Sequence, residues 1–216
     1  MKIKKSISII VADDHPMLLK GLYEELTENG YDVIGKAENG LIALELVLKL
    51  NPTLAIIDVD MPLLSGFEVV QMAKSKKVTT KFIIQTFHKE TNYIVQAKSL
   101  QIKGYLLKED SFLEIEKCIK SVINNSVYFS SSLQASSIEN ASTELKKLQF
   151  LSASEIVILK HISKQVSTNG IAEILNVSVR TIEKHRSNII AKLDLKTKTN
   201  SLTNWAFINK NIIANL

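Results

Sequence analysis

The chain has little cysteine and no long apolar segment, and each shortage excludes a class of protein. One cysteine among 216 residues cannot form an internal disulfide, which fits a reducing compartment. The apolar runs end well short of the roughly 18 residues needed to cross a bilayer. The basic start, Met1 to Lys5, resembles a signal n-region, but the apolar run after it ends at Asp13-Asp14 and not at a cleavage site. We therefore expect a cytoplasmic protein with no membrane segment.

Metal-binding patterns of cysteine and histidine are also missing, because the four histidines are scattered along the chain. Cys118 falls in a stripe with Ile115, Ile119 and Val122, and this spacing of three and four is typical of a buried helix face. The pattern predicts that Cys118 packs in a core and carries no chemistry.

Arginine is scarce, and it occurs in one segment only. Residues 1–149 carry 18 lysines against 18 acidic residues, whereas residues 150–216 carry 9 basic residues against 4 acidic ones. The net charge of +5 therefore belongs to the C-terminal third, where Arg180 and Arg186 lie in one helix-like segment. Local positive charge suits a polyanionic partner, although a basic helix can also be only a solvated face.

Four apolar runs each end in residues that can carry chemistry. The runs are Ile9 to Ala12 before Asp13-Asp14, Leu54 to Ile57 before Asp58, Phe82 to Ile84 before Gln85-Thr86, and Gly104 to Leu107 before Lys108. Continuous apolar runs suit strands that are buried on both faces of a parallel sheet, and ligands bind where such strands end. Three carboxylates gathered there would repel one another, so the pattern predicts Mg²⁺ together with phosphate oxygens.

Apolar runs and amphipathic segments alternate from Ser6 to about Asn124. The helix candidates are roughly 15–29, 39–49, 65–75, 90–101 and 110–124. This alternation predicts an α/β doubly wound domain over residues 1–124 with a five-stranded parallel sheet. The asparagine- and serine-rich residues 125–147 are interpreted as a linker, because they are too polar to order themselves without help.

Residues 148–216 are predicted to form a smaller all-α domain. Ser152 can cap a helix whose Glu155 reaches back to it, which is a capping box. A short helix over about 170–175 and a longer one from about Ser178 to Leu193 are separated by a brief turn, which indicates a helix-turn-helix.

The longer of these two helices has two different faces. Its apolar face consists of Val179, Ile182, Ile189, Ile190 and Leu193, and its polar face of Arg180, Thr181, Lys184, Ser187, Asn188 and Lys192. The polar face is suited to DNA. Arg186 falls within the apolar arc, so we expect it to form a structural ion pair and not to contact bases.

Together these segments resemble a known family. The strand-end motifs, which are Val11 to Pro16, Asp58 to Pro62 with Gly66, Gln85 to His88, and Lys103 to Lys108, resemble the receiver domain of two-component response regulators. The segments Ile171 to Leu175, Ser178 to His185 and Ser187 to Leu193 are similar to the LuxR-type DNA-binding domain, so the whole chain resembles a NarL/FixJ-type transcriptional regulator. Two departures affect the first turn of the helix-turn-helix: Gln165 stands where the family usually has glycine, and Gly170 where it usually has glutamate.

The resemblance implies a role for each strand-end residue. Asp58 would accept a phosphoryl group from a sensor histidine kinase or a small donor, Lys108 would supply positive charge, and Thr86 would supply a hydroxyl donor. The Mg²⁺ ligands would be Asp14, Asp58 and the backbone carbonyl of Asp60, with Asp13 acting through water. Movement of Thr86 toward the phosphoryl group would let Tyr105 turn inward. The expected consequence is dimerisation, or release of the C-terminal domain from an inhibitory contact.

The resemblance also implies how the chain meets DNA. Lys184 and Ser187 would contact base edges, and Glu183 could accept a hydrogen bond from a cytosine. The expected phosphate contacts are Arg180, Thr181, His185, Asn188 and Lys192. A homodimer would bind two half-sites. The final helix, with Leu202, Trp205, Ala206 and Ile208, resembles the family's dimerising helix, although packing within the domain is an equal explanation for Trp205.

Two other functions are open. Asp58-Val59-Asp60 after an apolar strand matches the nucleophile motif of haloacid-dehalogenase-like phosphatases. Alternatively, the protein could regulate DNA without phosphorylation or in response to a small ligand. We favour a transcriptional regulator that is not an enzyme beyond its own phosphotransfer and dephosphorylation.

Overall fold

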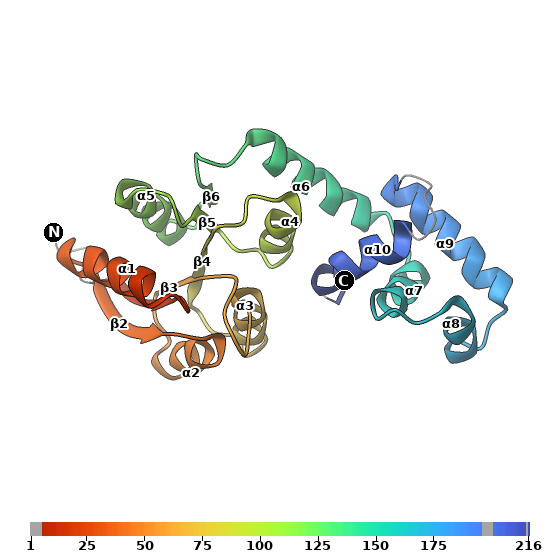
Figure 1. The fold of residues 1–216 in the computed structure, drawn as a ribbon, viewed down its shortest axis with the longest axis horizontal. Coiled ribbons are helices and arrows are strands. Elements are labelled where there is room, and N and C mark those ends of the chain that lie inside the picture. Colours follow the sequence, from red (N-terminus) through yellow and green to blue (C-terminus); the bar gives the residue numbers. More distant parts are fainter. Residues whose placement is uncertain (1–5, 196–200, 215) are drawn as a thin grey trace. The chain divides into compact units, whose positions relative to one another are not determined.

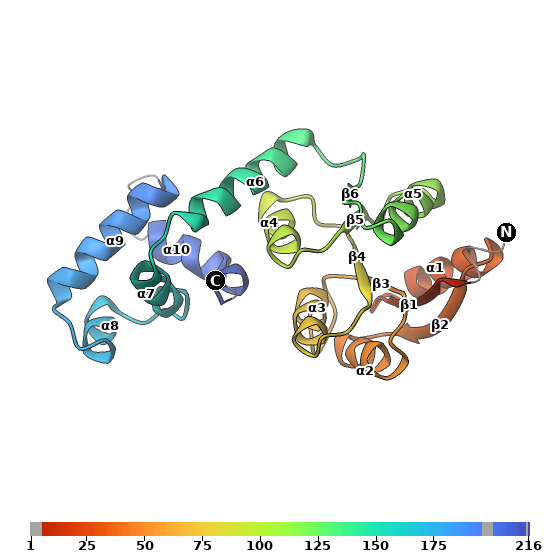
Figure 2. The same cartoon turned by 180° about the vertical axis from the view of Figure 1, so that it is seen from behind.

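The computed structural model describes residues 6–195, 201–214 and 216, and Figures 1 and 2 follow the chain from two sides. Among the described residues, contacts divide the chain into two compact units with their boundary between Ser137 and Ile138. Each unit has its own buried core and its own set of elements, so the two are taken in turn.

The N-terminal unit contains a parallel sheet of six strands in the order β2-β1-β3-β4-β5-β6. The strands are β1 (Ser8–Ala12), β2 (Asp32–Ala37), β3 (Leu54–Ile57), β4 (Lys81–Thr86), β5 (Gly104–Leu107) and β6 (Tyr128–Phe129). The doubly wound class is confirmed, but the expected number of strands, five, is one too few. The extra strand β6 comes from the segment interpreted as a linker, because the open edge of β5 offers unpaired backbone groups to it.

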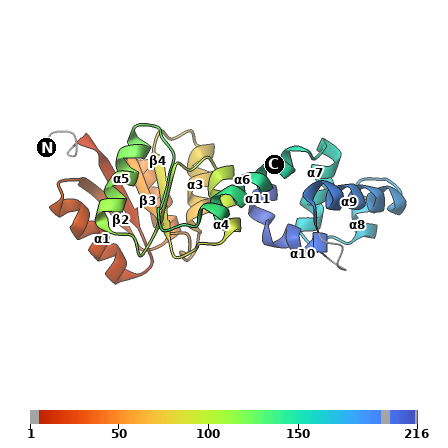
Figure 3. The same ribbon diagram turned by 90° about the horizontal axis from the view of Figure 1, so that it is seen from above.

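Helices cover both faces of this sheet, as Figure 3 shows. They are α1 (Pro16–Glu28), α2 (Gly40–Leu50), α3 (Gly66–Ser75), α4 (Thr91–Ser99) and α5 (Phe112–Ile123). Side chains of α1 and α5, among them Leu26 and Cys118, pack against Ile9, Val11 and Ile56 of the central strands. Cys118 is buried in this core, as predicted. The helices α3 and α4 lie on the other face, and α2 packs beside α3.

Local capping explains where several of these helices begin. The Asn39 side chain accepts a hydrogen bond from the backbone amide of Ile42 at 2.9 Å, at the start of α2. Ser65 and Glu68 form a complete capping box at the start of α3. These caps satisfy amide groups that have no partner inside the helix, so the sequence predicts the helix starts closely.

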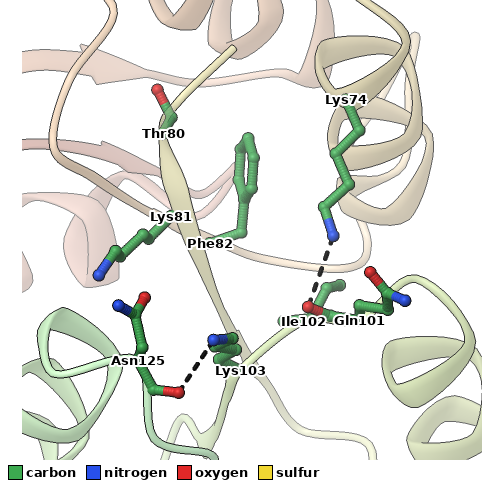
Figure 4. A pocket seen from close by; sticks show the side chains of 8 residues that line it. All are labelled: Lys74, Thr80, Lys81, Phe82, Gln101, Ile102, Lys103 and Asn125. Atoms are coloured by element: carbon green, nitrogen blue, oxygen red, sulfur yellow. Dashed lines mark hydrogen bonds between the residues drawn. The ribbon is translucent and has the colours of Figure 1, made fainter. Parts of the chain in front are cut away.

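Three lysines line a cavity at the edge of the sheet where β4 and β5 begin (Figure 4). Lys81 donates a hydrogen bond to the carbonyl of Ile123 at 2.6 Å, and Lys103 donates one to the carbonyl of Asn125 at 2.9 Å. Lys74 donates to the carbonyl of Leu100, the residue that caps the end of α4. A cation near the C-terminus of a helix satisfies its last carbonyls and its dipole. The three ammonium groups therefore hold the ends of helices together.

The C-terminal unit is helical. Its elements are α6 (Ala135–Gln149), which begins before the boundary, α7 (Ala153–Ser163), α8 (Thr168–Ile174), α9 (Val179–Leu193), α10 (Ser201–Ile208) and α11 (Lys210–Ala214). The predicted capping box of Ser152 and Glu155 is confirmed. Much of the segment interpreted as a linker is helical and lies in α6, where Ala141 and Leu148 are buried. These two apolar contacts supply the ordering free energy that its polar composition lacks.

The helix-turn-helix is formed by α8 and α9, joined by a short turn (Figure 2). Ser178 caps α9 and accepts a hydrogen bond from the amide of Thr181 at 3.1 Å. Ser167 caps α8 in the same way through the amide of Gly170 at 3.1 Å, so glycine at this position does not prevent the helix from starting. Gln165 has φ +61°, a left-handed conformation that favours glycine.

Candidate functional site: an acidic pocket and a basic helix face

The acidic pocket lies where β1 and β3 end, at neighbouring positions in the middle of the sheet. Strand order reverses around β1, and ligands of open α/β sheets bind at such a switch point. Four side chains each bring one atom that could bind a metal to within 4.8 Å of the others, namely those of Asp13, Asp14, His15 and Asp58. The prediction that the three carboxylates converge is confirmed. His15 was not predicted, although its position directly after the Asp pair was the available signal.

Lys108 neutralises this pocket from the end of β5. Its Nζ lies 2.7 Å from Asp58 Oδ2 and 2.8 Å from Asp13 Oδ2, and all three side chains are buried. Burial raises the pKa of the Asp58 carboxyl above its usual range, while the Lys108 ammonium opposes that rise. Burial alone would lower the pKa of Lys108, but the two carboxylates outweigh it and raise that pKa. The lysine is therefore held protonated beside the carboxylate that it contacts.

One oxygen of the pocket has no hydrogen-bond partner. Asp14 Oδ1 is buried and accepts no hydrogen bond, although His15 Nδ1 lies 2.9 Å away. A buried carboxylate oxygen without a donor is costly unless a cation is close to it. Together with the oxygen-only set of Asp13, Asp14 and Asp58, this orphaned atom fits a hard divalent cation such as Mg²⁺.

Gly66 is required by its close approach to the pocket. A Cβ at this position would lie 2.1 Å from the backbone oxygen of Asp58, which is far inside any contact distance. The Gly66 amide donates to the Val59 carbonyl at 2.9 Å, and the Val59 amide donates to Asp58 Oδ1 at 2.7 Å. The loop after β3 therefore packs tightly behind the central carboxylate.

The Asp60 side chain points to a different partner. Its Oδ2 lies 2.6 Å from Nε2 of His88, and the His88 ring stacks on Tyr93 with a centroid distance of 3.7 Å. The carboxylate of Asp60 is thus used outside the carboxylate cluster, which leaves only its backbone carbonyl for the predicted metal role. His88 was quoted in a motif but given no role, because the partner that it contacts is 28 residues away.

The predicted switch residues lie next to the pocket. Thr86 is buried, and its hydroxyl oxygen accepts a hydrogen bond from the amide of His88 at 3.3 Å. Tyr105 is also buried, and its hydroxyl donates to the His88 carbonyl at 3.0 Å. The inward position that we expected Tyr105 to reach only after phosphorylation is therefore already occupied here, and His88 connects the two switch residues.

The candidate DNA interface is the exposed face of α9. Arg180, Lys184, Ser187 and Asn188 are exposed, whereas Thr181 and His185 are partly buried. The Ser187 hydroxyl donates to the backbone carbonyl of Glu183 at 3.0 Å, so part of its hydrogen-bonding capacity is used within the helix. The exposed side chains of Arg180, Lys184 and Asn188 belong to the polar face of α9 that the sequence pattern predicts.

Two basic residues of α9 have structural partners. Lys192 Nζ lies 2.7 Å from Oε2 of Glu155, a buried carboxylate in the capping box of α7. Arg186 donates to the hydroxyl of Thr203 at 3.1 Å, so its predicted role inside the unit holds, but its partner is a hydroxyl and not the expected carboxylate. The helix α9 packs mainly against α7 and α8, and Arg186 reaches α10 through this one hydrogen bond to a neutral residue.

Two family models match the chain. A response regulator receiver domain matches residues 9–120, and a domain of bacterial regulatory proteins of the luxR family matches residues 149–204. The chain therefore belongs to the response regulators that combine a receiver domain with a LuxR-type DNA-binding domain, and it is a transcriptional regulator.

Similar proteins agree with this assignment over nearly the whole chain. The sequence is 31% identical over 200 residues to the transcriptional regulatory protein YdfI of Bacillus subtilis (strain 168), covering 90% of this chain and 93% of that protein. It is 27% identical to the response regulator protein VraR of Staphylococcus saprophyticus, covering 91% and 94%.

Solved structures resemble the N-terminal unit alone or nearly the whole chain. The receiver domain of the response regulator NarL from Mycobacterium tuberculosis is 30% identical with a TM-score of 0.53, covering 55% of this chain and 96% of that one. RcsB from Salmonella enterica serovar Typhimurium, solved bound to a promoter, is 20% identical with a TM-score of 0.65, covering 97% and 98%. The second likeness shows the fold.

Within the described ranges 6–195 and 201–214, every helix is too short or too polar to cross a membrane.

Proposed function

We propose that Asp58 accepts a phosphoryl group from a sensor histidine kinase or a small phosphodonor, and that this modification controls dimerisation and DNA binding. The observation that carries the proposal is the buried contact of Lys108 with Asp58 and Asp13. Beside it, a buried Asp14 oxygen accepts no hydrogen bond from the described residues and lies 2.9 Å from His15 Nδ1. Burial and a close charged partner shift the pKa of both Asp58 and Lys108, and groups shifted in this way cluster at functional sites.

The transfer needs an in-line attack by Asp58. A carboxylate oxygen forms a bond to phosphorus while the bond from phosphorus to the imidazole nitrogen of the donor breaks, and that nitrogen leaves with the electron pair. The product is an acyl phosphate on Asp58. Lys108 is already within 2.7 Å of the reacting carboxylate and would balance the charge of the phosphoryl oxygens.

A magnesium ion fits the oxygen ligands of the pocket. Asp14, Asp58 and the backbone carbonyl of Asp60 would hold it, with Asp13 acting through water, and when bound it supplies positive charge against the phosphoryl oxygens. The residues themselves position the acceptor: the Val59 amide and Lys108 each hold one oxygen of Asp58.

The output begins at Thr86. The phosphoryl group adds about −1.5 to −2 charge and three acceptor oxygens, and the Thr86 hydroxyl can donate to one of them. That movement would break the contact of its oxygen with the His88 amide, which is 3.3 Å long. Because Tyr105 holds the His88 carbonyl, the face formed by α4, β5 and α5 would change with it.

On DNA, α9 would enter the major groove with its first turns at the bases. Lys184 and Ser187 would contact base edges, while Arg180, Thr181 and Asn188 would contact phosphates, which position the domain without reading sequence. The exposure of Arg180 and Lys184 supports this assignment. The partners are thus double-stranded DNA, a sensor histidine kinase and a second copy of the chain.

The test is phosphorylation of the full-length protein with acetyl phosphate, followed by intact mass measurement. We expect one phosphoryl group per chain, dependent on Mg²⁺, and none in Asp58→Asn. Asp32→Asn is the matched control, since Asp32 is exposed at the start of β2 and is not part of the acidic pocket. Steady release of phosphate from esters would instead indicate a phosphatase. Equal DNA affinity of the wild type and Asp58→Ala under the same conditions would indicate regulation without phosphorylation.

A further inference from the structure

One carboxylate shapes the turn that presents Lys108. Asp110 lies two residues after Lys108, and its Oδ2 accepts a hydrogen bond from the amide of Leu107 at 2.8 Å. The Asp110 amide in turn donates to the carbonyl of Leu107 at 3.0 Å. Both bonds close a turn that has Lys108 and Glu109 at its tip, so the side chain of Asp110 helps to fix where the pocket lysine begins.

The other oxygen of the same carboxylate holds a distant segment. Asp110 Oδ1 accepts the hydroxyl hydrogens of Ser130 at 2.8 Å and of Ser132 at 2.9 Å. The Ser132 amide also donates to the Ser130 hydroxyl oxygen at 3.1 Å, and Ser130 is only 2% exposed. Helix α6 begins at Ala135, so Asp110 grips the chain immediately before that helix.

Glu114 provides a second grip on this segment. Its Oε1 accepts hydrogen bonds from the Tyr128 hydroxyl at 2.6 Å and from the Ser131 amide at 3.1 Å. The ring of Phe129 stacks on that of Tyr105 with a centroid distance of 6.0 Å. The residues from Tyr128 to Ser132, which we term the exit segment, are therefore fixed both to the pocket turn and to a predicted switch residue.

The other end of α6 reaches the DNA-facing helix within the C-terminal unit. Lys147 Nζ lies 3.4 Å from the carbonyl oxygen of Leu193, at the end of α9, and 3.4 Å from Oδ2 of Asp194, the residue that caps it. The helix that starts just after the exit segment thus ends in contact with the C-terminus of α9.

We propose that Asp110 is a positioning residue that couples the acidic pocket to the connection between the two units. By holding the Lys108 turn with one oxygen and the exit segment with the other, it passes a shift of Lys108 to the start of α6. The proposal rests on phosphorylation of Asp58. It adds the contacts through which phosphorylation of Asp58 would change the start of α6.

The test removes the hydrogen bonds of Asp110 Oδ1 to the exit segment while keeping the hydrogen bond of Asp110 Oδ2 to the Leu107 amide. Ser130→Ala/Ser132→Ala removes the exit side and leaves the Leu107 side intact, so Asp58 should be labelled by acetyl phosphate as in the wild type. Hydrogen exchange of α6 amides is then measured in the full chain with and without beryllofluoride and Mg²⁺. We expect the exchange change that the wild type shows in α6 to fall by at least about tenfold, because the variant loses two hydrogen bonds to a charged group and even one of them is worth about that factor.

Controls keep the outcome decisive. Ser136→Ala removes an exposed hydroxyl of α6 and should behave as the wild type. The single variant Ser132→Thr, with Ser130 unchanged, keeps a hydroxyl that can donate to Asp110. Its α6 exchange response should therefore match that of the wild type. An undiminished α6 response in the double alanine variant, or no α6 response in a wild type that is fully labelled, would overturn the coupling alone. Absence of labelling at Asp58 would overturn the proposed function itself.

Discussion

The two units hold their candidate functional groups in opposite ways. In the N-terminal unit Asp13, Asp58 and Lys108 are buried and within hydrogen-bond distance of one another. In the C-terminal unit Arg180 and Lys184 are exposed and lie on one helix face. A phosphoryl acceptor needs a few atoms fixed away from water, whereas a DNA-reading face needs donors that are free to enter a groove. Substitutions of these buried groups should therefore affect stability and chemistry together, whereas substitutions of Arg180 and Lys184 should affect binding alone.

The largest expected effect is that of Lys108→Met. It leaves Asp13 and Asp58 buried without their cation, and breaking such a pair costs about 3 to 5 kcal/mol. Mg²⁺ should recover much of this loss, because it supplies the missing positive charge. Urea unfolding with and without Mg²⁺ measures both effects. A variant as stable as the wild type in the absence of metal would contradict the electrostatic account of the pocket.

Lys184→Ala tests the opposite behaviour of the exposed face. We expect a loss of about 1 to 3 kcal/mol in discrimination between DNA sequences, with the free energy of unfolding unchanged. Arg180→Ala, the matched control, should weaken all sequences alike and lower the salt slope. Quantitative footprinting at several salt concentrations separates the two. If both variants lose affinity uniformly, Lys184 does not contact bases.

Lys192 tests whether a basic residue on the polar face of α9 stabilises the fold or binds DNA. Although it lies on the polar face of α9, its ammonium is paired with the buried Glu155. We expect Lys192→Met to destabilise the protein by about 1.5 to 3 kcal/mol, the range for a hydrogen bond to a charged group, and to leave the salt slope of DNA binding unchanged. A normal melting temperature together with a smaller salt slope would restore the earlier assignment of Lys192 as a phosphate contact.

Glu114→Gln should remove the part of the pH dependence of the unfolding free energy that comes from the Glu114 carboxylate. Hydrogen bonds from the Tyr128 hydroxyl and the Ser131 amide hold the pKa of Glu114 at about 2, below the usual 4.5. Because the folded pKa is depressed, the stabilisation is complete above 4.5 and is lost as the pH falls from there toward about 2. The advantage of the wild type over Glu114→Gln in urea unfolding should therefore shrink across this interval. A constant difference would contradict it.

Gln165→Gly is expected to have the smallest effect, and it should be stabilising. Gln165 has φ +61° after the end of α7, and a left-handed residue other than glycine costs about 1 to 2 kcal/mol. Glycine also has a larger unfolded-state entropy, so we expect a net gain of somewhat less than about 1 kcal/mol. Thermal unfolding of the full chain measures it. A loss of stability would show that the glutamine side chain makes a compensating contact.

Several features of the site could be predicted from the sequence because they follow from local rules. Asp13, Asp14 and Asp58 were expected to meet, since the carboxyl ends of parallel strands lie at one edge of a sheet. The capping boxes at Ser152 and Ser65 involve residues three positions apart, so they need no tertiary information. The apolar periodicity of α9 likewise identified its outer face before any contact was known.

Apart from His15, the features that were missed depend on partners far apart in the chain. Lys192 meets Glu155 37 residues away, and Asp110 meets Ser130 20 residues away. The polar composition of the exit segment suggested a linker, but an open strand edge and two carboxylates of α5 and its preceding turn order it. No periodicity in the sequence encodes these pairings.

The sequence by itself determined the alternation of strands and helices from β1 to α5, the starts of these helices and the residues at strand ends, because these depend on spacing and capping between near neighbours. The tertiary structure alone decided which charged groups are paired and which remain free. That outcome depends on which elements pack together and on how deeply each group is buried, and a buried charge must find a partner wherever the fold places one.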